Sequence, residues 1–283
     1  IYELYMIYII VPTFGNVEKT KDFLYSVKKS INKDYLVLLV DDHPENLTLN
    51  SVDQNSYTKV ISSKKELWWV GSINLGIKLL FEEYSVCDDD IVIFANNDVE
   101  IEEGCFEILQ SEIQKNKNQI VHPRTLDQNG DEVSSGAKIL TLFPYMTRHP
   151  KNFNKNKEII HMGTARFLMF SGTVLNKIGY VNNDLVQYGG DNDFTLTAKH
   201  FHKIDTYILK DAICKLDDTQ TGIKNHNIKN ISQLYNSFFA VKSPNNIKYR
   251  FILFKKFFGN VGAFFITVSI TINTIVKFIF KIR

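Results

Sequence analysis

The sequence predicts an α/β fold, a mostly parallel sheet flanked by helices, with an apolar helical extension at the C-terminal end. Short apolar runs alternate with segments of helical spacing along the first half of the chain. Acidic and amide residues directly follow several of those runs, and ligands of parallel sheets bind beyond the carboxyl ends of the strands. The strongly apolar composition from Phe251 onward predicts the extension.

The first half of the chain is expected to form four strands with helices between them. Each strand is a short apolar run closed by turn residues, as Pro12 and Gly15 close the first. Each helix is a stretch in which apolar residues recur three or four positions apart. The expected strands are 7–11, 35–40, 59–62 and 91–95, and the expected helices lie around 20–31 and 73–84.

The second half has a less regular pattern. Turn residues and prolines predict loops over the active face, and two adjacent glycines predict a sharp turn before a late helix. The expected elements are a helix around 106–113, loops at 127–132 and 143–158, a strand at 165–171, a helix at 174–178, a turn at 189–193 before a helix beginning near Phe194, and a last strand at 206–209.

Composition excludes several classes of protein. The 283 residues include 33 Lys+Arg against 31 Asp+Glu, so no overall field of one sign favours a nucleic-acid partner. Three cysteines without C-x-x-C spacing favour neither a disulfide framework nor a zinc site, which fits a reducing, cytoplasmic compartment. The first eight residues lack a basic segment, so no signal peptide is expected.

Asn96, Asn97 and Asp98 directly follow the expected fourth strand. A carboxylate at the end of a strand can bind Mg²⁺ or Mn²⁺ while the diphosphate of a substrate supplies further oxygen ligands. Asp98 is therefore the candidate metal ligand. A turn that merely ends the strand accounts for the same residues, because Asn and Asp are common in turns.

Asp41 and Asp42 end the second expected strand in the same way. An acceptor carboxylate there can bind the N–H of a nucleobase or a ribose hydroxyl, and a simple turn is again the alternative. Two acidic strand ends in successive units of one parallel sheet face the same crevice. Their combination is more specific than either alone.

A third acidic cluster lies at Asp191 and Asp193, after Gly189 and Gly190. Asp193 fits the N-cap of the following helix. Asp191 lies just outside that cap, where it can accept a proton from an attacking hydroxyl, and a simple capping turn is the alternative explanation. Farther upstream, Trp68 and Trp69 offer a face on which a base or sugar can stack, although burial explains adjacent aromatics equally well.

Taken in order, these segments resemble glycosyltransferase family 2, the inverting enzymes with a GT-A fold, and particularly its rhamnosyltransferase-like bacterial members. The resemblance runs from about Ile7 to Lys224. Its residues are Ile9-Ile10-Val11-Pro12-Thr13-Phe14, Val40-Asp41-Asp42, Asn74-Leu75-Gly76, Asn96-Asn97-Asp98, Asp127-Gln128-Asn129-Gly130 with Ser135-Gly136, Phe170-Ser171-Gly172 through Ile178-Gly179, and Tyr188-Gly189-Gly190-Asp191-Asn192-Asp193-Phe194.

The resemblance implies a role for each site residue. Asp98 would bind the Mg²⁺ or Mn²⁺ that bridges the donor's diphosphate, and Asp191 would be the general base. The donor would be a UDP- or dTDP-sugar, and the acceptor a cell-surface glycan or a lipid-linked saccharide. Contacts to the donor are assigned to Pro12, Thr13, Asp41, Asp42, Asn74, Asn96 and Asn97.

Two positions depart from the family pattern. Gly190 replaces a glutamate that would orient the acceptor or tune the base. A histidine that often completes the metal site is expected near 213–218, where Cys214, Lys215 and Leu216 stand; Asp217 or His226 is the candidate replacement. Both departures favour weak activity, an altered acceptor or a pseudoenzyme.

The tail differs in kind from the rest of the chain. Lys277 is its only charged residue between Phe257 and Phe280, so the stretch is long enough to span a bilayer. Basic residues at both ends equally suit a helix on anionic lipid, and packing on the catalytic domain or in a homodimer is the third alternative. The expected domains are 1–245, with a nucleotide-sugar half at 1–100 and an acceptor half at 101–245, and a membrane-associated tail at 246–283.

The sequence bears on three candidate functions. The leading hypothesis is a metal-dependent inverting glycosyltransferase at the inner face of the cell membrane, held peripherally or by its C-terminal segment. The second is a non-catalytic sugar-nucleotide or glycan-binding subunit of a membrane assembly, suggested by Gly190 and the missing histidine. A nucleotidyltransferase should carry a glycine-rich basic loop after the first strand, which residues 11–16 lack.

Overall fold

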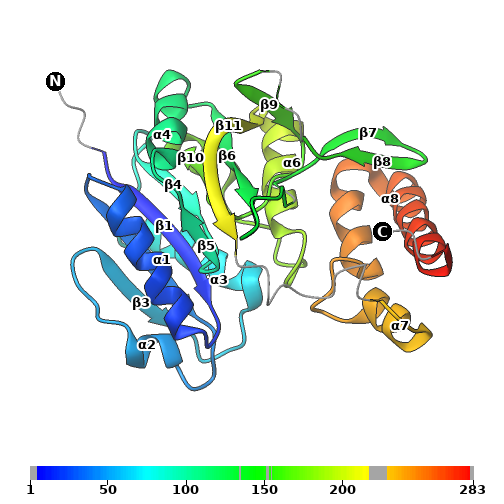
Figure 1. Ribbon diagram of the computed structural model, residues 1–283, viewed down its shortest axis with the longest axis horizontal. Coiled ribbons are helices and arrows are strands. Elements are labelled where there is room, and N and C mark those ends of the chain that lie inside the picture. Colours follow the sequence, from blue (N-terminus) through cyan, green and yellow to red (C-terminus); the bar gives the residue numbers. More distant parts are fainter. Residues whose placement is uncertain (1–4, 134, 151–152, 154, 217–227, 281–283) are drawn as a thin grey trace.

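The computed structural model of the protein describes residues 5–133, 135–150, 153, 155–216 and 228–280. A nine-stranded sheet forms its centre, with helices on both faces (Figure 1). The strands run in the order β3-β2-β1-β4-β10-β6-β11-β5, and β9 pairs with β11 off this path. They are β1 (Ile7–Thr13), β2 (Tyr35–Asp41), β3 (Thr58–Ser62), β4 (Ile91–Phe94), β5 (Val99–Ile101), β6 (Gln119–Leu126), β9 (Lys157–Ile160), β10 (Leu168–Ser171) and β11 (Asp205–Leu216).

Alternation along the strands divides the core into two layers. Ile7 and Ile9 of β1 pack toward one face of the sheet, and Tyr8 and Ile10 toward the other. The first face is covered by α1 and α4, and the second by α3, α5, α6 and part of α8. The helices are α1 (Val17–Ser30), α2 (Leu47–Ser51), α3 (Trp68–Glu82), α4 (Cys105–Lys115), α5 (Gly172–Ile178), α6 (Gly190–His202), α7 (Ile231–Phe239) and α8 (Ile247–Phe280).

The four N-terminal strands place a ligand crevice between β1 and β4. All three pairings among β3, β2, β1 and β4 are parallel. The chain builds outward from β1 to β2 and β3, and then crosses back to add β4 on the opposite side of β1. Such a reversal of strand order leaves an open crevice at the carboxyl ends of the two central strands. The predicted mostly parallel α/β fold is confirmed in this half.

The second half is more mixed than the sequence pattern predicted. β10 lies between β4 and β6 and is antiparallel to both. β11 extends to Leu216, well beyond the predicted 206–209, because it pairs with β6, β9 and β5 in turn. These pairings join residues far apart in sequence, and periodicity alone carries no information about them.

The helix that was expected to begin near Phe194 begins at Gly190 instead. Its N-cap is Gly189, with φ 92°, a left-handed conformation that glycine adopts without strain. Asp191 and Asp193 therefore lie in the first turn of α6, so the prediction of Asp193 as the N-cap is wrong. Carboxylates in a first turn interact favourably with the positive end of the helix dipole.

The polar stretch predicted as a loop at 143–158 includes the turn and the second strand of a β-hairpin. β7 (Lys138–Leu142) and β8 (Tyr145–Arg148) pair antiparallel, and the hairpin contacts α8. The ring of Phe143 lies 5.3 Å from that of Phe265, and Tyr145 N donates to Ser269 Oγ at 2.9 Å. The hairpin and the tail therefore form one unit.

The tail is not one straight helix. Gly259 breaks α8 with φ 67° and ψ 180°, and Figure 1 shows the parts before and after it as two separate rods, orange and red. Tyr249 and Leu253 before the break, and Ile266 after it, join the core cluster that covers the sheet. The helix has a mean hydropathy of 1.9 over its most apolar window, of which 22% is buried, and it is the one candidate membrane span among the described residues.

An ion pair connects the tail to α6. Lys256 Nζ lies 2.8 Å from Asp193 Oδ1, and Asp193 is only 1% exposed. The same ammonium donates to Thr197 Oγ1 at 2.7 Å, and the second oxygen of Asp193 accepts from the backbone of Asn182 at 3.1 Å. Asp193 thus has a structural role between α6, which packs on the sheet, and the tail.

Candidate functional site

Asp98 and Asp191 line the same large cavity. Its volume is about 1500 Å³, and its walls come from the loop after β4, the start of α6, the β7–β8 hairpin and α8. Asn96, Trp69 and Arg166 also line it. The arrangement brings together two acidic segments that are far apart in sequence, and it does so beside the carboxyl end of the central strand β4.

The loop after β4 positions three predicted residues in different directions. Asn96 lines the cavity, and its Oδ1 accepts from Trp69 Nε1 at 3.1 Å. Asn97 donates to Thr20 Oγ1 of α1 at 2.9 Å, so it braces the loop against the opposite helix layer. Asp98 is partly buried and lines the cavity. Of the three, Asn96 and Asp98 present oxygen atoms suited to a hard cation.

The described residues contain no group of three or more His, Cys, Asp or Glu side chains suited to holding a metal ion. A divalent cation at Asp98 would therefore need oxygen ligands from a substrate, which is the ordinary arrangement for Mg²⁺ bound to a diphosphate. This donor set fits such an ion. The candidates for a further ligand, Asp217 and His226, lie outside the described residues.

Cys214 takes part in packing at the position where the family histidine was expected. It is fully buried in β11, and its Sγ lies 3.7 Å from that of Cys105 on α4. Both thiols are free. Burial raises the pKa of Cys214, so its sulfur is a neutral thiol and a poor metal ligand.

Asp191 has the environment of a base. Burial raises the pKa of its carboxyl group, while hydrogen bonds from the backbone amides of Asn192 and Ala165 and the charge of Arg166 lower it in part. Asn192 N donates to Asp191 Oδ1 at 2.8 Å, which fixes the carboxylate at the cavity wall. A raised pKa strengthens a carboxylate as a proton acceptor.

The space beside Gly190 is filled by an aromatic ring. A Cβ at Gly190 would lie 2.7 Å from Val70 Cγ2 and 2.8 Å from Trp69 Cζ3. A glutamate at this position therefore cannot be accommodated while Trp69 holds its place against Asn96. Steric fit to Val70 and Trp69 is the structural reason for the glycine.

The acidic strand end at β2 is engaged by backbone amides. Asp41 is fully buried and accepts from His43 N at 3.1 Å and Leu49 N at 2.9 Å. Asp42 accepts from Leu67 N at 2.6 Å and Trp68 N at 2.7 Å. Burial raises the pKa of Asp42, and these two amides partly offset the effect. Both carboxylates thus order the loops beside the crevice.

The other predicted donor contacts are also structural in this conformation. Thr13 Oγ1 contacts Thr48 Oγ1 at 2.9 Å, and Pro12 lies partly buried in β1. Asn74 donates to Val181 O at 2.9 Å and Asn183 Oδ1 at 2.6 Å, and accepts from Val181 N at 2.9 Å. None of these three residues lines the large cavity.

Gly76 explains the other half of the N-x-G segment. A Cβ there would lie 2.4 Å from Ile10 Cγ2, so only glycine allows α3 to pack this closely on β1. The segment as a whole therefore fixes α3 between the sheet and the loop that leads to α6.

Several cavity residues gave no signal in the sequence. Arg166 and Arg250 bring positive charge to a site whose predicted members are acidic or neutral. His122 lies behind the wall, fully buried, with Nε2 2.8 Å from Thr164 Oγ1, and burial lowers its pKa to about 4. Isolated Arg and His residues have no spacing pattern, so only the fold reveals their position.

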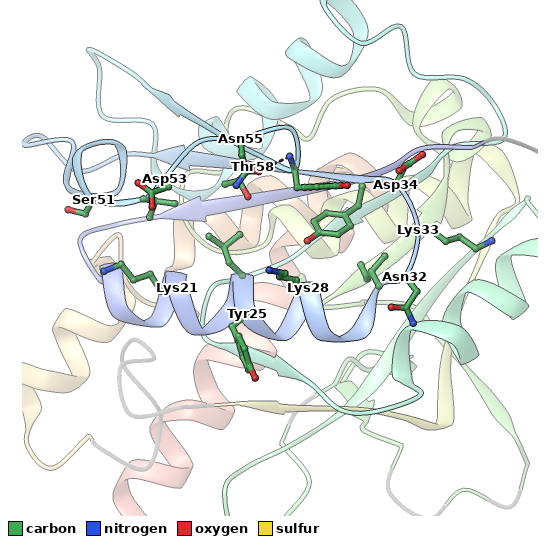
Figure 2. Close-up of a pocket in the computed structure, with 15 residues that line it drawn as sticks. Lys21, Tyr25, Lys28, Asn32, Lys33, Asp34, Ser51, Asp53, Asn55 and Thr58 are labelled. Carbon is green, nitrogen blue, oxygen red and sulfur yellow. Dashed lines mark hydrogen bonds between the residues drawn. The ribbon is translucent and has the colours of Figure 1, made fainter.

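A second cavity, of about 680 Å³, lies between α1 and the loops at the amino ends of β2 and β3 (Figure 2). Lys21, Tyr25 and Lys28 of α1 form one side, and Asp53 and Thr58 belong to the other. Ligands of parallel sheets bind at the opposite, carboxyl ends of the strands. The larger cavity is therefore the candidate active site.

The fold and the site define an α/β protein of the GT-A class. The family model described as "Glycosyl transferase family 2" matches residues 8–179, more than half of the chain. The chain therefore belongs to glycosyl transferase family 2. This confirms the predicted resemblance.

A solved structure with the same fold is described as "Crystal structure of GalNAc-T7 with UDP, GalNAc and Mn2+". It is similar with a TM-score of 0.60 and 11% sequence identity, over 89% of this chain. The match covers 51% of that chain, so the present chain spans about half its length. No curated protein matches the sequence.

Proposed function

We propose that the chain transfers a sugar from a nucleoside-diphosphate sugar, UDP- or dTDP-linked, to a glycan or lipid-linked saccharide with inversion at the anomeric carbon. The observation that carries this proposal is the convergence of Asp98 and Asp191 on one cavity beside the carboxyl end of the central strand β4. Family membership supports the same activity.

On the donor side, Asp98 and Asn96 offer oxygen ligands, and Arg166 supplies a fixed positive charge. Mg²⁺ or Mn²⁺ bound there would act as a Lewis acid on the diphosphate. The neighbouring structure with UDP and Mn²⁺ supports a divalent ion of this kind. Arg166 offsets negative charge that develops on the departing nucleoside diphosphate.

On the acceptor side, Asp191 takes the proton of the attacking hydroxyl. The acceptor oxygen forms a bond to the anomeric carbon as the bond from that carbon to the diphosphate oxygen breaks, and the electron pair leaves with the nucleoside diphosphate. A single displacement inverts the carbon and requires no covalent enzyme intermediate. The raised pKa of Asp191 suits this role.

The remaining predicted donor residues contribute by shaping the crevice. Asp41, Asp42, Asn74 and Asn97 hold loops through the hydrogen bonds described above, and Pro12 and Thr13 end the strand next to them. Because these loops are already ordered, their backbone groups can contact a nucleotide without losing further conformational entropy on binding.

We assign the tail to the cytoplasmic surface of the membrane. The helix is apolar and largely exposed, and its charged residues, Lys248, Arg250, Lys255, Lys256 and Lys277, are all basic. Basic side chains next to an apolar surface favour anionic lipid. Because the hairpin and the first part of α8 also line the cavity, this placement would bring the site to a lipid-linked acceptor.

The alternative is a non-catalytic subunit that binds sugar nucleotides. Gly190 and the small number of acidic ligands around Asp98 favour it. The two functions differ in turnover, since a binding subunit would hold the donor and release no product.

Transfer by purified protein tests the proposal. With Mn²⁺ or Mg²⁺, a panel of UDP- and dTDP-sugars and lipid-linked or soluble glycan acceptors, we expect release of nucleoside diphosphate that requires the metal. Asp184→Asn is the matched control, because Asp184 is exposed and does not line the cavity. Donor binding without release across the panel would favour the non-catalytic alternative.

A further inference from the structure

Arg250 places a partly buried cation in the wall of the candidate active-site cavity. It belongs to the first part of α8 and lines the cavity that contains Asp98 and Asp191. Its Nε donates to Pro244 O at 3.0 Å, and its Nη2 donates to Asn245 Oδ1 at 2.6 Å. These two bonds fix the plane of the guanidinium.

The third nitrogen of Arg250 is buried and unused. Nη1 is shielded from solvent and has no hydrogen-bond partner among the described residues. No carboxylate in the described part of the chain forms an ion pair with this guanidinium. Burial lowers its pKa to about 10, so it still carries a full charge at neutral pH. A buried, charged N–H group without a hydrogen-bond acceptor is costly, and an anionic ligand that accepts from Nη1 removes that cost.

The wall next to Arg250 is apolar. Phe264, Phe265 and Ile272 of α8 line the same cavity, as does Phe143 at the tip of the hairpin. All four side chains are more than two-fifths exposed, although they belong to a cavity wall. An apolar surface of this kind, beside a fixed cation, suits a ligand that carries an anionic group at one end of a hydrocarbon chain.

We infer that the acceptor is a lipid phosphate or lipid diphosphate that carries the saccharide, with its phosphate bound by Arg250 and its hydrocarbon chain along α8 and the hairpin. This inference rests on the proposed function and names the acceptor class of the same site. Arginine recognises phosphate oxygens with charge-assisted hydrogen bonds, and Nη1 of the ordered Arg250 guanidinium is the nitrogen left for such a contact. The saccharide then extends toward Asp191.

Three ligands distinguish binding of a lipid diphosphate from binding of the hydrocarbon chain alone or of free diphosphate. We would titrate wild-type protein with farnesyl diphosphate, farnesol and inorganic diphosphate, by calorimetry and without metal. Farnesyl diphosphate is expected to bind at least tenfold more tightly than either of the others. Arg250→Gln should lose at least tenfold in affinity for farnesyl diphosphate and leave farnesol unchanged. Equal binding of farnesol and farnesyl diphosphate by the wild type would overturn the inference.

The donor gives the second arm of the test. Arg250→Gln should bind UDP with Mn²⁺ as the wild type does, because that diphosphate is assigned to Asp98 and Arg166. If UDP affinity falls as far as that for farnesyl diphosphate, Arg250 serves the donor and the inference is wrong. Failure of the proposed function has a different signature, namely normal binding of both ligands by the wild type and no transfer.

Two further variants control for folding. Lys248→Gln removes a charge from an exposed position of the same helix and should change none of these affinities. Arg250→Lys keeps the charge but loses the planar fork, so it should fold if the glutamine variant does not and should still weaken farnesyl diphosphate binding severalfold. Wild-type affinity in a folded Arg250→Lys would contradict phosphate recognition by the guanidinium.

Discussion

At the scale of single residues, the two carboxylates of the site, Asp98 and Asp191, have different surroundings. Asp98 lies on a loop at the end of a central strand, where a cation and a diphosphate can reach it. Asp191 lies in the first turn of α6, where burial raises its pKa. The two groups therefore suit different steps, departure of the diphosphate for Asp98 and proton acceptance for Asp191.

The raised pKa of Asp191 predicts the pH dependence of transfer. The base must be ionised, so kcat/KM should fall as pH decreases through a pKa above the ordinary aspartate value of about 3.9. A pH profile of kcat/KM at saturating metal measures it. An acid limb at or below the ordinary aspartate pKa would show that burial does not govern this group.

The close packing around Gly190 predicts that a side chain added there destabilises the protein, and that a smaller residue at position 69 relieves part of the loss. Gly190→Ala places a methyl group against Trp69 and Val70, and overpacking of this kind costs about 1–3 kcal/mol in the free energy of unfolding. Trp69→Leu removes the ring, so the double variant should lose less stability than the sum of the two single variants. Urea denaturation of all four proteins measures the coupling. If the stability losses of the two single variants simply add in the double variant, the Trp69 ring is not what requires glycine at position 190.

At the scale of elements, an ion pair between Asp193 of α6 and Lys256 of α8 joins the two helices. Lys256→Gln leaves the Asp193 carboxylate, 1% exposed, without its cation. Breaking a buried ion pair by removing one partner costs about 3 kcal/mol, the lower end of the usual range, because the lysine is partly exposed. Urea denaturation measures the loss. Lys255→Gln, at an exposed neighbouring position, should stay near wild type, and equal stability of both variants would exclude the pair as a connection.

The elements also show how far the sequence alone could predict this fold. The strands that end at Thr13, Asp41 and Phe94 were predictable because each is a short apolar run followed by turn residues. The position of Asp98 followed from that pattern. β10 and the long β11 were not predictable, because their neighbours in the sheet lie far away in sequence.

The roles of individual site residues were harder to predict. Asp42 was assigned to the donor as a polar strand end and Asn74 by its place in the family's N-x-G segment, and in the fold both side chains form hydrogen bonds with loop backbone or a neighbouring amide. Sequence reasoning missed Arg250 because a single arginine next to the start of an apolar stretch resembles a flanking charge. Burial and direction of a side chain depend on tertiary packing, which no local pattern encodes.

At the scale of the whole molecule, one face carries both the cavity mouth and an apolar surface. The hairpin and α8 contribute exposed apolar side chains, and the aromatic contact between Phe143 and Phe265 joins the two elements. α1 lies at the other side of the molecule in Figure 1. Such a surface is unusual on a protein that remains free in solution.

This surface predicts binding to anionic vesicles. Cosedimentation should be stronger with phosphatidylglycerol vesicles than with phosphatidylcholine vesicles and should weaken at high salt, because the charged residues of α8 are basic. The double variant Val261→Ser with Phe264→Ser removes two exposed apolar residues of α8 and should reduce binding severalfold. Tyr25→Ser is the control, since Tyr25 is 72% exposed on α1. Equal binding of the two variants would argue against α8 as the contact.

The central claim is that Asp98 holds the donor and Asp191 activates the acceptor, and titration of a UDP-sugar with Mn²⁺, paired with product release, tests it most directly. Asp98→Ala is predicted to lose metal-dependent donor binding by at least tenfold. Asp191→Asn is predicted to bind the donor like the wild type and to release product about 10²–10⁴-fold more slowly. Wild-type donor affinity in Asp98→Ala together with wild-type turnover in Asp191→Asn would contradict the account.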